Sequence, residues 1–267
     1  MKNLKQLKGD ASTRKFFRKK STNSTSIIIF SKKEKIKNLL VYDAINKILI
    51  KNKILAPILY SENYKKNFIE VEDFGNRTIL QILNKSKNRF FYFKRVIKLL
   101  NQIQSIKDKT VKDFKNKNYK IPNYGRRELI KEANLFCEWY VKKELSKKEG
   151  DKFTKKYKKI IKKILSSLKM KNNVFVHRDF HVSNLMFFKN QIGVIDSQDA
   201  LIGNKAYDLS SLIDDVRLET STSFKKKIYN FYVKDQKKHE IDKFKNDFEI
   251  LSVLRNLKII EFLQDLQ

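Results

Sequence analysis

The hydrophobic pattern of this chain changes character near residue 73, and this order of patterns limits the folds open to it. Before residue 73, short extended segments predict strands at 15–19, 26–30 and 67–71. One helix is predicted at residues 34–51, where apolar side chains recur every four positions. After residue 73, helical patterns dominate. The chain is therefore expected to form an α+β fold.

The later part of the chain carries amphipathic helices and one embedded β-hairpin. The stripe Leu129, Ala133, Phe136 and a second stripe between residues 157 and 168 predict helices. Two apolar segments at 185–188 and 192–195, separated by Lys-Asn-Gln, predict the hairpin. We expect a small antiparallel-sheet lobe in residues 1–73 and a larger, mostly helical lobe in residues 74–267. A ligand is expected where the two lobes meet.

Composition bears on the partners of the protein. The 267 residues include 60 Lys and Arg against 29 Asp and Glu, a net charge of +31. Nucleic acid is nevertheless not expected as the partner, because lysines are spread along the whole chain and A/T-rich codons explain their abundance. The positive field favours an anionic substrate such as ATP.

The location of the protein is predicted from three further features. The N-terminus leads into no signal-like apolar region, and no apolar run approaches the roughly 20 residues of a membrane span. Cys137 is the single cysteine and cannot form an internal disulfide. We expect a cytoplasmic protein without a membrane partner.

The residues that carry chemistry lie in the loop His177–Asn184 and just after the hairpin. Its form is H-x-D-x-x-x-x-N, with Asp179 and Asn184 five positions apart, and the hairpin then leads back to Asp196. Phosphoryl transfer needs a carboxylate that orients and deprotonates a hydroxyl, together with hard oxygen ligands for Mg²⁺. Asp179 is the expected base, and Asn184 and Asp196 are the expected metal ligands.

Four segments resemble the aminoglycoside phosphotransferase superfamily, whose members are relatives of protein kinases. The similarity is closest to the branch of anomeric N-acetylmuramate/N-acetylglucosamine kinases, and it is carried by residues 7–18, 177–186, 195–200 and 207–212. The resemblance implies a protein-kinase-like two-lobe fold, ATP and Mg²⁺ as cofactors, and an amino sugar phosphorylated at its C1 hydroxyl in cell-wall recycling.

The resemblance also implies roles for further residues. Gly9, Ser12 and Arg14 correspond to the loop that covers the ATP phosphates, and the strand containing Glu70 and Glu72 would meet adenine through its backbone. Lys32 is the nearest candidate for a lysine that grips phosphate. His177 and Asp208 would support the catalytic loop.

Three residues near the active loop keep two readings each. His181 is expected either to contact substrate or to pack. Gln198 and Asp199, next to the metal-binding Asp, are expected either to bind sugar hydroxyls or to hold their loop. Ser197 replaces a phenylalanine usual in the branch, and we expect it to loosen that loop.

The acceptor also stays open. The same fold handles choline, homoserine, aminoglycosides and other sugars. A strongly basic chain favours a neutral or anionic acceptor, such as N-acetylmuramate. A non-catalytic pseudokinase that binds nucleic acid or a protein is the remaining alternative. The sequence does not predict an oligomeric state.

Overall fold

The computed structural model describes residues 4–7 and 14–264, and it divides the chain into two compact units. The first unit comprises residues 1–121 and 182–200, and the second comprises residues 122–181 and 201–267. This division differs from the boundary expected near residue 73. The difference arises because the segments after residue 73, and the hairpin after residue 184, contact the N-terminal part of the chain.

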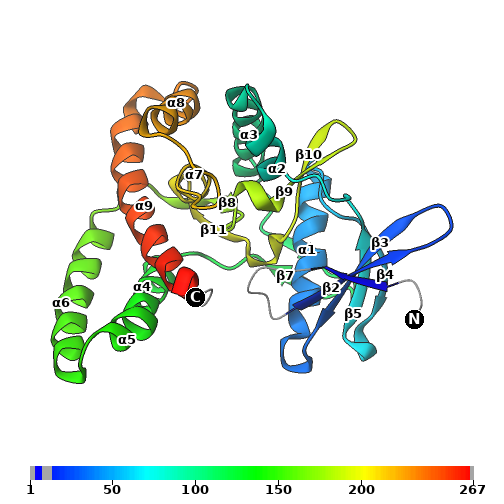
Figure 1. Ribbon diagram of the computed structural model, residues 1–267, viewed down its shortest axis with the longest axis horizontal. Coiled ribbons are helices and arrows are strands. Elements are labelled where there is room, and N and C mark those ends of the chain that lie inside the picture. The colour runs from blue at the N-terminus through cyan, green and yellow to red at the C-terminus, as the bar shows by residue number, and fades with distance from the viewer. Residues whose placement is uncertain (1–3, 8–13, 265–267) are drawn as a thin grey trace. The chain divides into compact units, whose positions relative to one another are not determined.

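A five-stranded antiparallel sheet forms the first unit's N-terminal part, in the order β1-β2-β3-β5-β4 (Figure 1). Its strands are β1 (Leu4–Leu7), β2 (Arg14–Lys20), β3 (Thr25–Ser31), β4 (Leu59–Asn63) and β5 (Phe68–Glu72). Phe16 lies opposite Ile29, and Arg18 lies opposite Ile27. Since opposite residues share a face, this register puts β2 side chains at even positions on the face that carries Ile27 and Ile29.

Helix α1 (Lys37–Lys51) provides the apolar layer against this sheet (Figure 1). Its Leu39 and Tyr42 pack with Ile29, Ile69 and Val71, and all five side chains are buried. The unit also contains α2 (Ile79–Lys85), α3 (Arg89–Gln104) and the short strand pair β6 (Thr110–Lys112) and β7 (Asn118–Lys120). One-turn 3₁₀ helices occur at Lys33–Lys35, Tyr64–Lys66, Val182–Asn184 and Ser197–Asp199.

The predicted hairpin is confirmed as β9 (Leu185–Phe188) and β10 (Gln191–Val194), and it belongs to the first unit. Lys189 and Asn190 form its two-residue turn, both with positive φ, which matches the right-handed twist of the strands. The Phe187 N–H donates to the Arg77 carbonyl, and the Val194 N–H donates to the Leu55 carbonyl, each at 2.8 Å. These bonds hold the hairpin against segments that flank the sheet.

The second unit is mostly helical and contains one small sheet. Strand β8 (Asn172–Val176) pairs with β11 (Leu201–Asn204). Helices α4 and α7 both pack against α9, the last helix. The helices are α4 (Arg126–Phe136), a π-helical turn (Cys137–Val141), α5 (Lys142–Glu144), α6 (Lys147–Ser166), α7 (Ala206–Ile213), α8 (Thr222–Val233), a 3₁₀ turn (Lys238–Glu240) and α9 (Ile241–Gln264). Among the residues described, no helix combines the length and apolar character that crossing a bilayer requires.

Candidate active site

A cavity of about 270 Å³ lies within the first unit. Its apolar wall comes from the sheet and α1, through side chains that include Phe16, Ile27 and Val71. Its polar wall includes Asn184 and Asp196. A mostly apolar hollow with a few polar groups at one side is the usual form of a small-ligand site. The volume is close to the lower end of such pockets, roughly 300 Å³.

Asn184 and Asp196 reach this cavity because they flank the open end of the β9–β10 hairpin. Asn184 directly precedes β9, and its carbonyl accepts a hydrogen bond of 3.0 Å from the N–H of Ile195. Asp196 follows with φ of 62°, a left-handed conformation that Asp tolerates better than most residues. An amide oxygen and a carboxylate in one polar wall fit Mg²⁺, which prefers hard oxygen ligands and shares them with phosphate and water.

Arg14, expected among the phosphate-binding residues, lies beside Asp196. Its Nη2 donates to Asp196 Oδ1 at 2.7 Å, and only 7% of the Arg14 side chain is exposed. The other two members of that group, Gly9 and Ser12, lie outside the described residues. Lys32 lies just beyond β3, is exposed, and is not among the cavity-lining residues.

Ser197 holds the loop after Asp196, contrary to the expectation that it would loosen it. The residue is fully buried, and its hydroxyl donates to Asn46 Oδ1 of α1 at 2.6 Å. A buried hydrogen bond of this kind replaces the apolar anchor that a phenylalanine would supply. The loop is therefore tied to α1 by polarity rather than by packing.

Replacing Ser197 by alanine is expected to lower the free energy of unfolding by about 1–3 kcal/mol, because the Asn46 oxygen would stay buried without its donor. Urea unfolding followed by circular dichroism measures this change. Ser105→Ala is the matched control, since Ser105 is exposed at the end of α3 and should shift stability by less than about 0.5 kcal/mol. Equal stability of S197A and the wild type would contradict the anchoring role.

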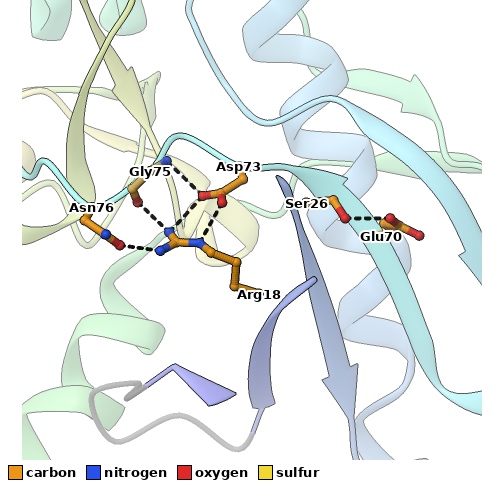
Figure 2. A network of polar contacts seen from close by, with 6 residues as sticks. All are labelled: Arg18, Ser26, Glu70, Asp73, Gly75 and Asn76. Carbon is orange, nitrogen blue, oxygen red and sulfur yellow. Dashed lines mark hydrogen bonds and ion pairs between the residues drawn. The ribbon is translucent and has the colours of Figure 1, made fainter. Parts of the chain in front are cut away.

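The other residues proposed near the metal and adenine positions separate into two sets. Glu72 lines the cavity. The Glu70 side chain instead accepts from Ser26 at 2.6 Å (Figure 2). It also pairs with Lys19 at 3.0 Å. Burial opposes a low pKa for Glu70, but these two donors lower its pKa overall. Glu70 therefore contributes a cross-strand network, and any contact with adenine would be through its backbone.

Gln198 and Asp199 contact each other shortly after Asp196, the expected metal ligand. The Gln198 amide donates to Asp199 Oδ2 at 2.8 Å. Gln198 is buried and Asp199 is exposed, and neither lines the cavity. The structure thus provides a loop-holding contact for this pair, and a role in binding sugar stays a prediction.

A network that sequence reasoning missed joins β2 to the segment 73–76, which leaves the sheet after β5. Arg18 contacts Asp73 through Nε at 2.6 Å and Nη2 at 2.9 Å, the Gly75 carbonyl at 2.8 Å, and Asn76 Oδ1 at 2.5 Å (Figure 2). Burial works against ionisation of Asp73, but Arg18 lowers its pKa. Because Arg18, Asp73 and Gly75 line the cavity, this network shapes its rim.

In the second unit, Asp208 braces the loop that carries Asp179. Asp208 is fully buried in α7 and accepts from the N–H groups of His177 at 2.7 Å and Arg178 at 2.9 Å. Arg178 has φ of 76°, an unusual conformation that such bonds help to hold. His177 is fully buried and packs its ring edge-on against Phe180. Both residues act on the shape of the loop.

The surroundings of Asp179 keep it ionised. Burial alone would raise its pKa, but Lys258, His181, Arg255 and Arg178 together lower it to about 2. The surroundings of His181, in contrast, disfavour its charged form. Burial, followed by Arg217, lowers its pKa to about 4, although Asp215 and Asp179 oppose the change. At neutral pH the loop therefore presents a carboxylate beside an uncharged imidazole.

Glu132, Arg255 and Lys258 are residues of this site that the sequence reading did not identify. Glu132 in α4 pairs with Arg178 and accepts from the hydroxyls of Tyr124 and Tyr207. Burial opposes ionisation of Glu132, but Lys258 and Arg178 lower its pKa. Arg255 and Lys258 lie three positions apart on α9, so they share a helix face. This three-residue spacing was visible in the sequence. It did not stand out, because lysine is abundant along the whole chain.

The pKa of Asp208 predicts a specific pH dependence of stability. Burial raises it from 3.8 to about 7, even though two N–H donors lower it. A raised folded-state pKa stabilises the protein below 3.8, and this contribution is lost as pH rises through about 7. The unfolding free energy of the wild type minus that of Asp208→Asn should thus fall between pH 4 and 7, by at most about 4 kcal/mol.

Chemical unfolding at several pH values measures this difference. His181 provides an internal control with the opposite sign, because its lowered pKa gives stability that is present above 6.5 and lost as pH falls towards 4. That slope should survive in D208N. A difference between the two proteins that does not change with pH would rule out a raised pKa at Asp208.

Comparison with known proteins extends these observations. The chain is 26% identical to an N-acetylmuramate/N-acetylglucosamine kinase of Neisseria meningitidis over 94% of its own length and 74% of that protein. It is 28% identical to a protein of the same name from Pseudomonas putida, over 77% of this chain but only 58% of the relative. The match thus leaves a large part of the second relative uncovered.

Solved structures with low sequence identity share the fold. An ethanolamine kinase of Plasmodium vivax matches with a TM-score of 0.66 at 15% identity, covering 96% of this chain and 74% of the other. The ADP-bound aminoglycoside phosphotransferase APH(2'')-Ib matches with a TM-score of 0.64 at 18% identity, covering 99% and 92%. The protein-kinase-like α+β fold expected from the sequence is therefore confirmed.

A family model described as "Phosphotransferase enzyme family" matches residues 3–240. This range contains Asp179, Asn184 and Asp196. The match covers most of the chain and agrees with both the fold and the kinase names of its relatives. The chain therefore belongs to the aminoglycoside phosphotransferase (APH) family of phosphotransferase enzymes and is a kinase of that family.

Proposed function

We propose that this protein transfers the γ-phosphoryl group of magnesium-bound ATP to the anomeric hydroxyl of N-acetylmuramate or N-acetylglucosamine. The observation that carries the proposal is the polar wall of the first unit's cavity, where Asn184 and Asp196 lie together. The names of the relatives support the acceptor, and the ADP-bound neighbour supports the nucleotide. Cell-wall recycling in the cytoplasm is the setting that this reaction implies.

The residues of the chain divide the work of the reaction. The apolar wall formed by Phe16, Ile27 and Val71 would take the adenine, and Asn184 and Asp196 would hold Mg²⁺. When bound, Mg²⁺ neutralises charge that develops on the phosphate oxygens. Asp179 would accept a hydrogen bond from the sugar hydroxyl and aim its oxygen at the γ-phosphorus.

The low pKa of Asp179, about 2, bears on when the proton moves. A carboxylate this weakly basic does not deprotonate the acceptor hydroxyl to a significant extent before the reaction begins. As the new P–O bond forms and the bond from the γ-phosphorus to the bridging oxygen of ADP breaks, the attacking oxygen becomes acidic and gives its proton to Asp179. We infer that Asp179 orients first and accepts the proton late. An anomeric hydroxyl, more acidic than an ordinary alcohol, suits such a base.

The charges near Asp179 favour an uncharged or anionic acceptor. Lys258, Arg255 and Arg178 act on Asp179 itself, and Arg217 acts on its neighbour His181. A cationic acceptor such as choline or an aminoglycoside would add positive charge to this group. The carboxylate of N-acetylmuramate would instead be attracted to it. The net charge of +31 points in the same direction.

The test is a transfer assay with a defined panel. The protein is incubated with ATP, Mg²⁺ and either N-acetylmuramate, N-acetylglucosamine, choline, ethanolamine, homoserine or an aminoglycoside. Mass spectrometry identifies a phosphorylated product, and coupling between phosphorus and the C1 proton in NMR identifies an anomeric phosphate. Asp179→Asn protein is the control for contaminating kinase activity.

Anomeric phosphate on either amino sugar, formed by the wild type and not by D179N, is the expected result. Product from choline, ethanolamine, homoserine or an aminoglycoside alone would reject the amino sugar as the acceptor, while the assignment as a kinase would stand. No product with any acceptor, combined with salt-sensitive binding of nucleic acid, would favour the pseudokinase alternative.

A further inference from the structure

The ion pair between Arg14 and Asp196 joins a cation of the sheet to a proposed metal ligand. Nη2 of Arg14 and Oδ1 of Asp196 are 2.7 Å apart, and the two side chains are 7% and 34% exposed. The pair is thus mostly withdrawn from water on the arginine side, where charges interact more strongly than at the surface. The residues are 182 positions apart in sequence, so the fold itself brings them together.

Strand β2 carries two arginines on this face of the sheet. Arg14 lies opposite Ser31 of β3, and Arg18 lies opposite Ile27. Both arginines therefore share the face of β2 that carries Phe16 towards the cavity. Strand β3, residues 25–31, contains no Lys or Arg at all. Strand β3 therefore offers no cation to a bound phosphate.

The side chains of Arg14 and Arg18 have different partners. Arg18 uses Nε, Nη1 and Nη2 on Asp73, Gly75 and Asn76, at the rim of the cavity formed by residues 73–76 (Figure 2). Arg14 points its Nη2 at the carboxylate proposed to hold Mg²⁺. Arg14 is therefore the arginine of β2 placed where metal and phosphate would meet.

A metal ion at Asp196 would bring a second positive charge close to the Arg14 guanidinium. Two cations that share one carboxylate repel each other, and a further anion beside them offsets this repulsion. The phosphates of a nucleotide supply that anion, and a guanidinium binds phosphate oxygens through paired N–H donors. Bound phosphate would offset the repulsion between the metal and Arg14. A bound metal would, in turn, favour the binding of phosphate.

We propose that Arg14 couples metal binding to nucleotide binding at this site, so that Asp196 takes a divalent ion strongly only when phosphate arrives with it. This inference rests on the proposed function, since it takes Asp196 as a metal ligand. It goes beyond that function by assigning Arg14 a positioning role. Because such coupling is reciprocal, the metal must raise nucleotide affinity by the same factor by which the nucleotide raises metal affinity.

Binding measurements without turnover test the proposal. Mn²⁺ replaces Mg²⁺ because electron paramagnetic resonance counts its free ions, and ADP replaces ATP. The affinity of Mn²⁺ is measured with and without ADP, and calorimetry gives the affinity of ADP with and without Mn²⁺. In Arg14→Met, Mn²⁺ alone should bind more tightly, ADP alone more weakly, and the coupling factor should fall at least about tenfold.

Two further variants complete the design. Lys15→Met removes the same charge from the neighbouring, exposed position of β2 and should behave like the wild type. Arg14→Lys keeps the charge and should keep Mn²⁺ alone as weak as in the wild type, which decides the matter if R14M does not fold. Melting curves establish that each variant is folded.

The outcomes separate this inference from the proposed function. Wild-type coupling in R14M, an equal loss in K15M, or tighter Mn²⁺ binding by R14K than by the wild type would overturn the role of Arg14 alone. Failure of the wild type to bind ADP with Mn²⁺ would overturn the proposed nucleotide site, and the role of Arg14 with it.

Discussion

Replacing Asp179 by asparagine is expected to lower turnover by about 10²–10⁴-fold while leaving nucleotide affinity nearly unchanged. Asparagine keeps the size of the side chain but cannot accept the proton of the attacking hydroxyl. Asp179 is not among the residues that line the first unit's cavity, where ATP is proposed to bind. Steady-state kinetics with the identified acceptor, together with calorimetric ADP affinity, measures both quantities.

A matched control separates this effect from loss of a negative charge. Asp235→Asn removes one carboxylate from an exposed position of the second unit and should leave turnover unchanged. If D179N retained wild-type turnover, Asp179 would not be the base. If it lost turnover and ADP affinity together, the division of labour between Asp179 and the metal ligands would be wrong.

Replacing Asp196 by alanine is expected to abolish the increase that Mg²⁺ gives to ADP affinity. Asp196 is the carboxylate of the polar wall proposed to hold the ion, and Asn184 alone supplies only an uncharged oxygen. Calorimetric titration with ADP, in Mg²⁺ and then in EDTA, measures the increase directly. Adenosine binding should survive, because it depends on the apolar wall.

The choice of readout makes this second test specific. A misfolded D196A protein would lose adenosine binding as well, whereas loss of a metal ligand removes only the magnesium-dependent part. Retention of the full increase in D196A would show that the ion is held elsewhere. Asp199→Asn is the matched control, since Asp199 lies three residues further on, is exposed, and does not line the cavity.

Much of the fold was predictable because its elements have local signatures. Alternating or continuous apolar residues predicted β2, β3 and β5, and the four-residue repeat predicted α1. The hairpin followed from two apolar segments around a polar break. Among the strands without such a prediction, β6, β7 and β11 have only three or four residues, too few for a period to be seen.

The boundary between the compact units could not be derived in the same way. It depends on where backbone groups find partners, such as Val194 with Leu55 and Phe187 with Arg77. These bonds join segments more than a hundred residues apart and have no periodic trace in the sequence. The expected boundary at residue 73 marked a change of secondary structure, which is a different property from compactness.

The amino-acid order alone was sufficient to identify a kinase of this family. It also led to the prediction that Asp179 is the base and that Asn184 and Asp196 are metal ligands, because their spacing within one loop and hairpin is typical of that chemistry. The folded chain was needed to find Arg14 beside Asp196, Ser197 bonded to α1, and Glu132 with Arg178. Those contacts join residues 46 to 182 positions apart, and charge pairing across such distances depends on burial and packing, which no local pattern records.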